Sequence, residues 1–470
     1  MKSFSIWGLR LSITFYALLH FFTYFYEVTI LLYILSASGF LVILFTGMRL
    51  KVNQFKLPLF LFIVGVLVMI FSDGSLAVGF YNGFLQMRSI IGLLVIVPMI
   101  SWVLREEPYI EDILAYAHRA INTSRKFYFG IVSFTQVIAY FLLFGAIPMM
   151  YQFINVILKN QKGEAWENFK GTALLRAFAL STLWVISIPS FIFAVETMGA
   201  SLWISILQGF GIAVLGTIAA VIFSYFQEKK YGVNLTVELR NEIDTVLRSN
   251  PNKAEVKKKV IEFMILFITL FGTIFLLHAI YTFNLMIIIP IVVVIWTCLY
   301  YLIKKKKKKL IKETRTYFTE DMVKQSYQLS IMMAAGVLIY GLNQTPFGTT
   351  VIDGIYYIQD VFPFLNFLYF LPFIVIFLGF IGLGPLTVMV LVAGLLENIY
   401  LPYPPELIVL AITSGSVISI LLSPVIMPVI VLSASNGLSL LKNGVRFNYK
   451  YAIVFYIIVQ VYLQTMVHIW

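Results

Sequence analysis

The sequence predicts an all-α polytopic membrane protein of about 10–12 transmembrane segments, with two re-entrant hairpins in an inverted repeat. Three observations support this prediction. Apolar runs long enough to cross a bilayer recur along the whole chain, which is 60% hydrophobic and only 12% charged. Lysine and arginine are concentrated in a few loops between these runs. Two of the runs are interrupted in the middle by serine and proline.

The composition also limits the partners. The net charge of +12 lies in loops between apolar runs, so we assign it to topology and to anionic lipid headgroups, and we expect no nucleic acid. Cys298 is the only cysteine, and the four histidines are scattered, so no disulfide or metal cluster is expected. No cofactor is expected beyond a Na⁺ coupling ion. The longest polar loops are too short to form a soluble domain.

The basic loops fix the predicted sides of the membrane. By the positive-inside rule these loops are cytoplasmic, which places the amino terminus inside and the carboxyl terminus outside. The basic loops are residues 49–56, 105–127, 227–259, 304–328 and 442–450. The chain is therefore expected to lie in the cell membrane as a multi-pass protein, in contact with lipid.

Counting crossings between these loops predicts the two hairpins. If 128–154 crosses outward and 201–226 returns, then 174–199 must begin and end outside. By the same count, 407–435 must begin and end inside. Each segment carries a break at its centre, and proline inside an apolar helix frees backbone carbonyls that need partners. We therefore predict two re-entrant hairpins that enter from opposite faces.

The expected organisation has four parts. The N-terminal membrane helices occupy 1–127, and the first repeat core occupies 128–226 with hairpin 174–199. Residues 227–327 hold cytoplasmic loops and two connecting helices. The second repeat core occupies 328–470 with hairpin 407–435.

Landmark residues support the repeat. Pro148 and Pro385, Pro189 and Pro424, and Gly199 and Gly437 recur in the same order at one spacing of about 235–238 residues. Because the two halves have opposite predicted orientations, this is the pattern of an inverted-repeat transporter.

Three short motifs and this architecture resemble the ion transporter superfamily, which includes divalent-anion symporters and arsenite permeases. The motifs are Gly-Leu-Gly-Pro at 382–385, Ser423-Pro424, and SASNGLSL at 433–440. The resemblance covers 128–226 and 328–470, and implies that two hairpin tips meet near the midplane, where substrate and coupling ion bind. Dicarboxylate carriers of that family have Ser-Asn-Thr or Ser-Asn-Pro at both tips. Here the tips lack asparagine, so a dicarboxylate substrate does not carry over.

The candidate substrate-binding residues are mostly small hydroxyl residues and prolines at the two breaks. Serine hydroxyls at a helix break either bind a ligand or bond to their own backbone, and the sequence leaves both open. Arg88, inside an apolar run, either binds an anionic solute, pairs with Glu196 or is a structural cation. The predicted substrate-binding set is Ser187, Pro189, Ser190, Ser423, Pro424, Asn436, Thr387 and Arg88.

The candidate ion-coupling residues are Glu196, Gly145, Gly382 and Gly384. Glu196 is either a proton carrier or an acid at the membrane interface. The glycines break their helices, which either exposes carbonyls to a cation or only kinks the helix for packing.

We therefore expect a secondary active transporter for a small, anionic solute, coupled to Na⁺ or H⁺, and not an enzyme. A homodimer is left open. Two other functions are compatible with many spans: a membrane component of cell-envelope polysaccharide assembly, and a non-transporting membrane scaffold. The first of these usually has a long outer loop with histidine or acidic residues, which this sequence lacks.

Overall fold

The computed structural model describes residues 2–72, 75–107, 109, 113, 123–158, 161, 163–232, 235–237, 253–281, 283–362 and 365–469. Within these residues every regular element is a helix, which confirms the all-α fold. Ten helical stretches of the described chain are long and apolar enough to cross a membrane. The protein is therefore a multi-pass membrane protein.

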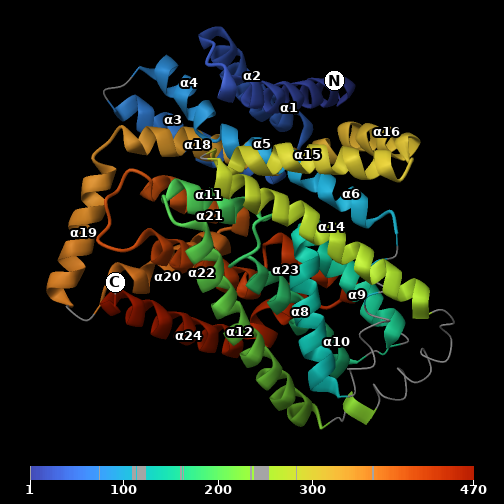
Figure 1. The fold of residues 1–470 in the computed structure, drawn as a ribbon. Helices are drawn as coiled ribbons and strands as arrows, with labels where there is room; N and C mark the ends of the chain where they lie inside the picture. Colours follow the sequence, from blue (N-terminus) through green and yellow to red (C-terminus); the bar gives the residue numbers. More distant parts are fainter. Residues whose placement is uncertain are drawn as a thin grey trace.

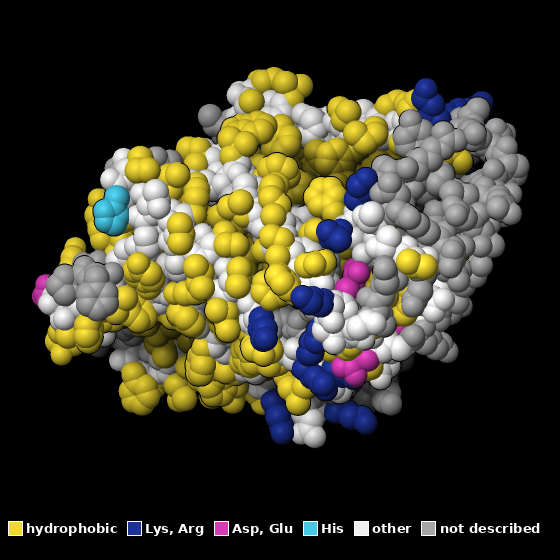
Figure 2. Space-filling model, turned by 90° about the horizontal axis from the view of Figure 1, so that it is seen from below, with side chains coloured by type: hydrophobic (Ala, Val, Ile, Leu, Met, Phe, Trp, Pro, Cys, Tyr) yellow, Lys and Arg dark blue, Asp and Glu magenta, His cyan; other side chains and the backbone are white. Residues whose placement is uncertain are grey.

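The surface agrees with a bilayer environment. Large apolar side chains point outward along several long helices; Leu207 is 67% exposed and Val461 is 64% exposed. Figure 2 shows apolar side chains over the left and centre of one face, whereas Lys and Arg gather toward the right. A broad exposed apolar surface of this kind is stable only against lipid or protein.

One group of helices forms the upper part of the molecule in Figure 1, except that its helix α14 runs diagonally down from the centre to the lower right, past α8 and α9. In this group α18 packs on α2, α3 and α4, α5 packs on α1 and α15, and α14 packs on α15. The elements are α1 (Lys2–Phe25), α2 (Thr29–Arg49), α3 (Val52–Phe71), α4 (Leu76–Gln86), α5 (Arg88–Ile96), η1 (Val97–Met99), α6 (Ile100–Leu104), α14 (Lys253–Ile280), α15 (Leu285–Ile303), α16 (Lys307–Thr316), η4 (Tyr317–Asp321), α17 (Met322–Lys324) and α18 (Ser326–Asn343).

A second group lies below it and contains every broken helix discussed here. It is joined to the first group through α11, which contacts α5 and α15, and through α21, which contacts α18. The elements are α8 (Ser124–Leu142), η3 (Leu143–Gly145), α9 (Ala146–Ile157), α10 (Glu164–Ser181), α11 (Pro189–Thr197), α12 (Leu202–Tyr231), α19 (Phe347–Val361), α20 (Phe367–Phe380), α21 (Pro385–Leu396), α22 (Pro405–Leu422), α23 (Met427–Asn436), η5 (Lys442–Arg446) and α24 (Phe447–Ile469).

The long helix α12 defines two ends of this group. Its 30 residues span about 45 Å at 1.5 Å per residue, enough for a whole bilayer. Its last turn carries Lys229 and Lys230, and we call this the basic end. At that end the Tyr231 hydroxyl donates to Glu164 Oε1 at 3.4 Å. At the opposite end the Ser201 backbone N–H donates to Glu406 Oε1 at 2.8 Å.

These contacts show that the prediction of hairpins over 174–199 and 407–435 is wrong. α10 starts at the basic end with Glu164, and α11 ends a few residues before α12 begins at the opposite end. α22 starts at the opposite end with Glu406, and α23 ends next to Lys442, which bonds Glu164 at the basic end. Each predicted hairpin is instead a pair of half-helices that together run from one end to the other.

The chain doubles back in two other places. α8 begins at the basic end, where Ser124 N–H donates to Thr236 Oγ1 just beyond α12, and α9 returns there, where Asn155 Oδ1 accepts from Lys170 of α10. The second hairpin is α20–α21. α20 begins opposite the basic end, where Asn366 bonds Gln464 near the end of α24, and α21 leads back to the start of α22.

The crossing count failed for a physical reason. An apolar stretch such as 128–154 is long enough to cross a membrane, and composition alone does not reveal a turn inside it. The turn is made at Leu143, whose φ of 48° lies in the left-handed region. Because 124–157 forms a hairpin, α10–α11 must cross from one end to the other. In the second half, α20–α21 forms the hairpin, so α22–α23 must cross.

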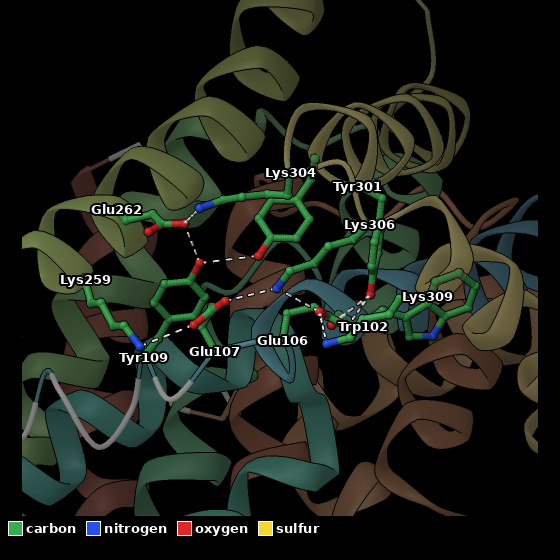
Figure 3. Close-up of polar contacts among 11 residues, drawn as sticks. Trp102, Glu106, Glu107, Tyr109, Lys259, Glu262, Tyr301, Lys304, Lys306 and Lys309 are labelled. Carbon is green, nitrogen blue, oxygen red and sulfur yellow. Dashed lines mark hydrogen bonds and ion pairs between the residues drawn. The ribbon is translucent and has the colours of Figure 1, made fainter.

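The lysine run at 304–309 has acidic partners within the protein. Figure 3 shows Lys306 between two carboxylates: its Nζ lies 3.1 Å from Glu106 Oε2 and 3.0 Å from Glu107 Oε1. Lys309 Nζ also lies 2.8 Å from Glu106 Oε2, and Lys304 pairs with Glu262 of α14 at 2.5 Å. The segment after α6 is therefore tied to the segment after α15 by ion pairs, beyond the lipid contact expected from the sequence.

This cluster predicts a pH dependence. The hydrogen bond from Lys306, partly opposed by burial, lowers the pKa of Glu107. A carboxylate with a lowered pKa in the folded state stabilises it above its ordinary pKa of about 4.3, and this contribution is lost as the pH falls below that value. We expect Lys306→Met to lower the thermal midpoint at pH 7, with the difference from the wild type disappearing toward pH 3. A difference that stays constant from pH 7 to pH 3 would refute the ion-pair account.

The broken helix α22–α23 predicts the sides of the two surface positions that flank it. In a Cys298→Ala background, Tyr400→Cys precedes α22, and Ser439→Cys lies between α23 and α24 at the basic end. Tyr400 is 89% exposed. A membrane-impermeant thiol reagent should label these two cysteines from opposite sides of sealed vesicles. Labelling of both from the same side would show that α22–α23 doubles back instead of crossing the membrane.

Candidate functional site

The break between α22 and α23 is held by a hairpin. The Ser423 hydroxyl donates to the Gly379 carbonyl oxygen of α20 at 3.0 Å, and the Ser423 side chain is fully buried. A Cβ at Gly379 would collide with Ser419 Oγ, so the glycine permits this close approach. Ser423 thus satisfies a carbonyl near the end of a helix, while Pro424 is half-buried in the break. The hydroxyl predicted to bind substrate has a structural partner.

The break between α10 and α11 is buried. Pro189 is the first residue of α11, where its missing N–H costs nothing. The Ser190 hydroxyl donates to Met389 Sδ of α21 at 3.4 Å. Ser187 is 1% exposed, and its hydroxyl finds no partner among the described residues. Thr387 is buried on α21, the helix that α11 packs against.

The three glycines predicted to take part in ion coupling lie at the two hairpin turns. Gly382 has φ of 104° and lies beside Val425 of the other break, and Gly384 immediately precedes α21. Gly145 lies in the turn between α8 and α9, and it is exposed. The second hairpin turn thus adjoins the break that holds Ser423. No contact brings Gly145 to that place in the described part of the chain.

Glu196 and Arg88 lie elsewhere. Glu196 Oε1 accepts from the Leu285 backbone N–H at 2.7 Å, and Oε2 accepts from Asn284 Nδ2 at 2.9 Å. It therefore binds the start of α15, as expected for a structural acid at a helix N-terminus. Arg88 is the first residue of α5, which packs on α1 and α15. In the described residues these two predicted site residues do not meet.

The structure contains a polar cavity at a place where the sequence predicted one residue, Asn436. Its volume is about 540 Å³, and it lies at the basic end between α9, the start of α10 and the end of α23. Its wall is formed by the hairpin helix α9 and by the half-helices α10 and α23. The lining residues are Tyr151, Asn155, Gln161, Gly163, Glu164, Glu167, Lys170, Ser435, Asn436, Leu438 and Lys442.

A buried ion pair forms one wall of this cavity. Lys170 is 1% exposed, and its Nζ lies 2.5 Å from Glu167 Oε1, one helical turn earlier. Lys170 also donates to Asn155 Oδ1 at 2.7 Å and to the Gln161 carbonyl at 3.1 Å. Glu167 Oε2 accepts from the Tyr151 hydroxyl at 2.8 Å. All three ammonium donors and both carboxylate oxygens are therefore used, as a buried pair requires.

A chain of amides leads from the cavity to a second buried cation. Asn436 Nδ2 donates to Asn443 Oδ1 at 2.8 Å, and Asn448 Nδ2 donates to the Asn443 carbonyl at 2.9 Å. Arg176 Nε then donates to Asn448 Oδ1 at 3.0 Å. Arg176 is fully buried, and its guanidinium lies 4.4 Å from the centre of the Tyr451 ring. Asn436 is thus the outer member of a network that joins α23, α24 and α10.

A second, exposed ion pair lies at the rim. Lys442 Nζ is 2.8 Å from Glu164 Oε2, and Arg446 Nη2 is 3.7 Å from Glu164 Oε1. The Glu164 and Lys442 side chains are 39% and 22% exposed. This pair connects the first turn of α10 with the segment between α23 and α24.

Sequence analysis missed Glu164, Glu167, Lys170 and Arg176. The predicted crossing ended at 154 and the predicted hairpin began at 174, so residues 155–173 were assigned to no helix. The missed signal is the spacing of Glu164, Glu167 and Lys170, which recur every three residues, about one helical turn apart. Charged residues at that spacing beside an apolar helix indicate a polar face turned toward protein.

No protein-family model and no curated protein matches this chain.

The buried pair predicts a stability effect. Glu167→Gln leaves the Lys170 ammonium buried without its carboxylate, which we expect to cost about 3 kcal/mol of unfolding free energy. The matched control is Asp321→Asn, which removes an exposed pair with Lys324 and should cost under about 1 kcal/mol. The double variant Glu167→Gln, Lys170→Met should recover part of the loss because no buried charge remains unpaired. Unfolding in detergent measures all three, and equal effects of Glu167→Gln and Asp321→Asn would contradict the burial argument.

Proposed function

We propose that the protein is a secondary carrier that moves a small polar solute across a membrane, coupled to Na⁺ or H⁺, and that it is a distant relative of the ion transporter superfamily. The observation that carries the proposal is the pair of broken helices, α10–α11 and α22–α23, each running between the two ends of the molecule. Irregular backbone at membrane depth is rare outside binding sites and cavities. A scaffold that only spans the membrane has no need of it.

The order of elements supports an internal repeat. α8–α9, α10–α11 and α12 form a doubled-back pair, a broken helix and a long helix, and α20–α21, α22–α23 and α24 follow the same order. Each hairpin contacts the broken helix of the other unit: α9 contacts α23, and α21 contacts α11. Corresponding helices of the two units also contact each other, α10 with α22 and α12 with α24. Such exchange of partners is what a two-fold relation between the units would produce.

Backbone landmarks recur at matching places in the two units. Leu143 and Gly382 have left-handed φ at the two hairpin turns, and Gly199 and Gly437 have φ of 65° and 70° just after α11 and α23. The first hairpin has both ends at the basic end, and the second has both ends opposite. This reversal supports an inverted repeat, with both hairpins re-entrant and the basic end cytoplasmic.

The breaks supply the means to bind a solute or ion. The half-helices α11 and α23 each begin part-way between the two ends of the molecule, where unpaired N–H groups and the helix dipole favour negative charge, whereas the carbonyls that end α10 and α22 favour cations. The two units meet along α10–α22 and α12–α24. Movement of this group against the helices α1–α5, α15 and α18 would alternate access to the two sides.

A transport assay tests the proposal. Purified protein in liposomes should take up at least one solute from a panel of labelled amino acids, carboxylates, sugars and nucleosides under a Na⁺ or proton gradient. Gly382→Ala forces a Cβ onto a left-handed residue at the hairpin turn and should slow uptake about tenfold. The matched control is Gly211→Ala, within the continuous helix α12, where a Cβ meets nothing within 4 Å. Absence of uptake under every gradient would refute a carrier, and equal uptake rates for the two variants would refute a role of the hairpin turn in transport.

A further inference from the structure

The cavity at the basic end has balanced charge. Its lining includes two carboxylates, Glu164 and Glu167, and two ammonium groups, Lys170 and Lys442. An anionic solute, the class expected from the sequence, would face two carboxylates there with no excess of cations. The charge of the cavity therefore does not favour an anion, and it equally does not favour a cation.

The two ion pairs differ in how easily they separate. Lys170 and Glu167 are buried and fully bonded to each other and to Asn155, Gln161 and Tyr151, so separating them would leave uncompensated charges. This pair forms a fixed wall. Glu164 and Lys442 are partly exposed, and exposed pairs contribute about 0–1 kcal/mol, so they separate at small cost.

The separable pair bridges two elements that come from different parts of the chain. Glu164 is in the first turn of α10, and Lys442 and Arg446 belong to η5, between α23 and α24. Separation of the pair would leave the Glu164 carboxylate on one side of the rim and the Lys442 ammonium group on the other. That arrangement is complementary to a ligand that carries both charges.

We propose that this cavity binds a small zwitterion, with its ammonium group on Glu164 and its carboxylate on Lys442. The ligand replaces one ion pair by two, whereas a dianion leaves Glu164 unpaired and a dication leaves Lys442 unpaired. Ser435, Asn436 and Asn155 line the same cavity and offer hydrogen bonds to the rest of the solute. The volume of about 540 Å³ lies within the range of small-molecule sites.

The inference rests on the proposed function in one respect: it takes the bound zwitterion to be the solute that the carrier transports. Binding itself is a separate property of the cavity. The same zwitterion can therefore be tested first for binding and then for transport.

Calorimetric titration of the purified full-length protein tests the site. The probes are glycine, β-alanine, 4-aminobutyrate and 6-aminohexanoate, which vary the spacing of the charges, with succinate and propylamine as single-sign controls. We expect at least one zwitterion to bind about tenfold or more tightly than both controls, since each charge-assisted hydrogen bond contributes about 1.5–3 kcal/mol. Tighter binding of succinate or propylamine, or no binding of any zwitterion, would overturn the inference.

Variants at the rim identify the residues. Glu164→Gln and Lys442→Gln should each weaken zwitterion binding about tenfold. The double exchange Glu164→Lys, Lys442→Glu keeps both charges on opposite walls and should restore binding in the reversed orientation. Lys324→Gln, in an exposed pair with Asp321 outside the cavity, is the matched control and should leave binding unchanged. Unchanged binding in both single variants would overturn the assignment of the site.

Uptake by proteoliposomes separates this inference from the proposed function. A zwitterion that binds but is not taken up would contradict the carrier and leave the binding site standing. Uptake of another solute class, unaffected by Glu164→Gln, would contradict the site and leave the carrier standing.

Discussion

The structure depends on one constraint: inside a bilayer, backbone groups freed at a helix break must find partners within the protein. Each unpaired group in hydrocarbon costs several kcal/mol. At the second break the Ser423 hydroxyl donates to the Gly379 carbonyl of the neighbouring hairpin. At the first break the Leu183 carbonyl lies so close to α12 that a Cβ on Gly209 would collide with it. Each break is therefore held against a specific neighbour, and this contact positions the helices that meet at the cavity.

Buried charge imposes a similar requirement. Lys170 is stabilised by a carboxylate and two neutral acceptors, whereas Arg176 donates to an amide, a tyrosine hydroxyl and backbone carbonyls, with the Tyr451 and Phe223 rings on its faces. Because each cation needs several acceptors at fixed positions, Lys170 fixes α10 against α9, and Arg176 fixes α10 against the start of α24. The rim pair Glu164–Lys442 is the ion pair of this region that separates at the smallest cost in free energy, so a ligand can replace it most easily.

Much of the fold could be predicted from the sequence because hydropathy and charge are strong signals in membranes. The proline-serine clusters at 187–190 and 423–428 correctly marked two helix breaks, and lysine-rich loops marked one end of the molecule. The direction of the chain at the breaks could not be predicted. A turn at Leu143 and a break at Ser187 look alike in composition, although the first reverses the chain and the second does not. The landmark comparison also paired Pro189 with Pro424, whereas Pro428 is the proline in the first turn of α23.

The site was less predictable than the fold. Asn436 was found because it belongs to the motif at 433–440, but Lys170 and Glu167 could not be recognised without knowing that α10 starts at Glu164. The account rests most on the claim that the group that holds the two broken helices moves against the helices α1–α5, α15 and α18 during function. In a Cys298→Ala background, spin labels at Ala434 on α23 and Leu11 on α1, both exposed, measure the separation of the two groups by pulsed electron resonance in liposomes. A carrier predicts two distances whose populations shift when a zwitterionic solute is added. A single distance that no solute or ion gradient changes would contradict it.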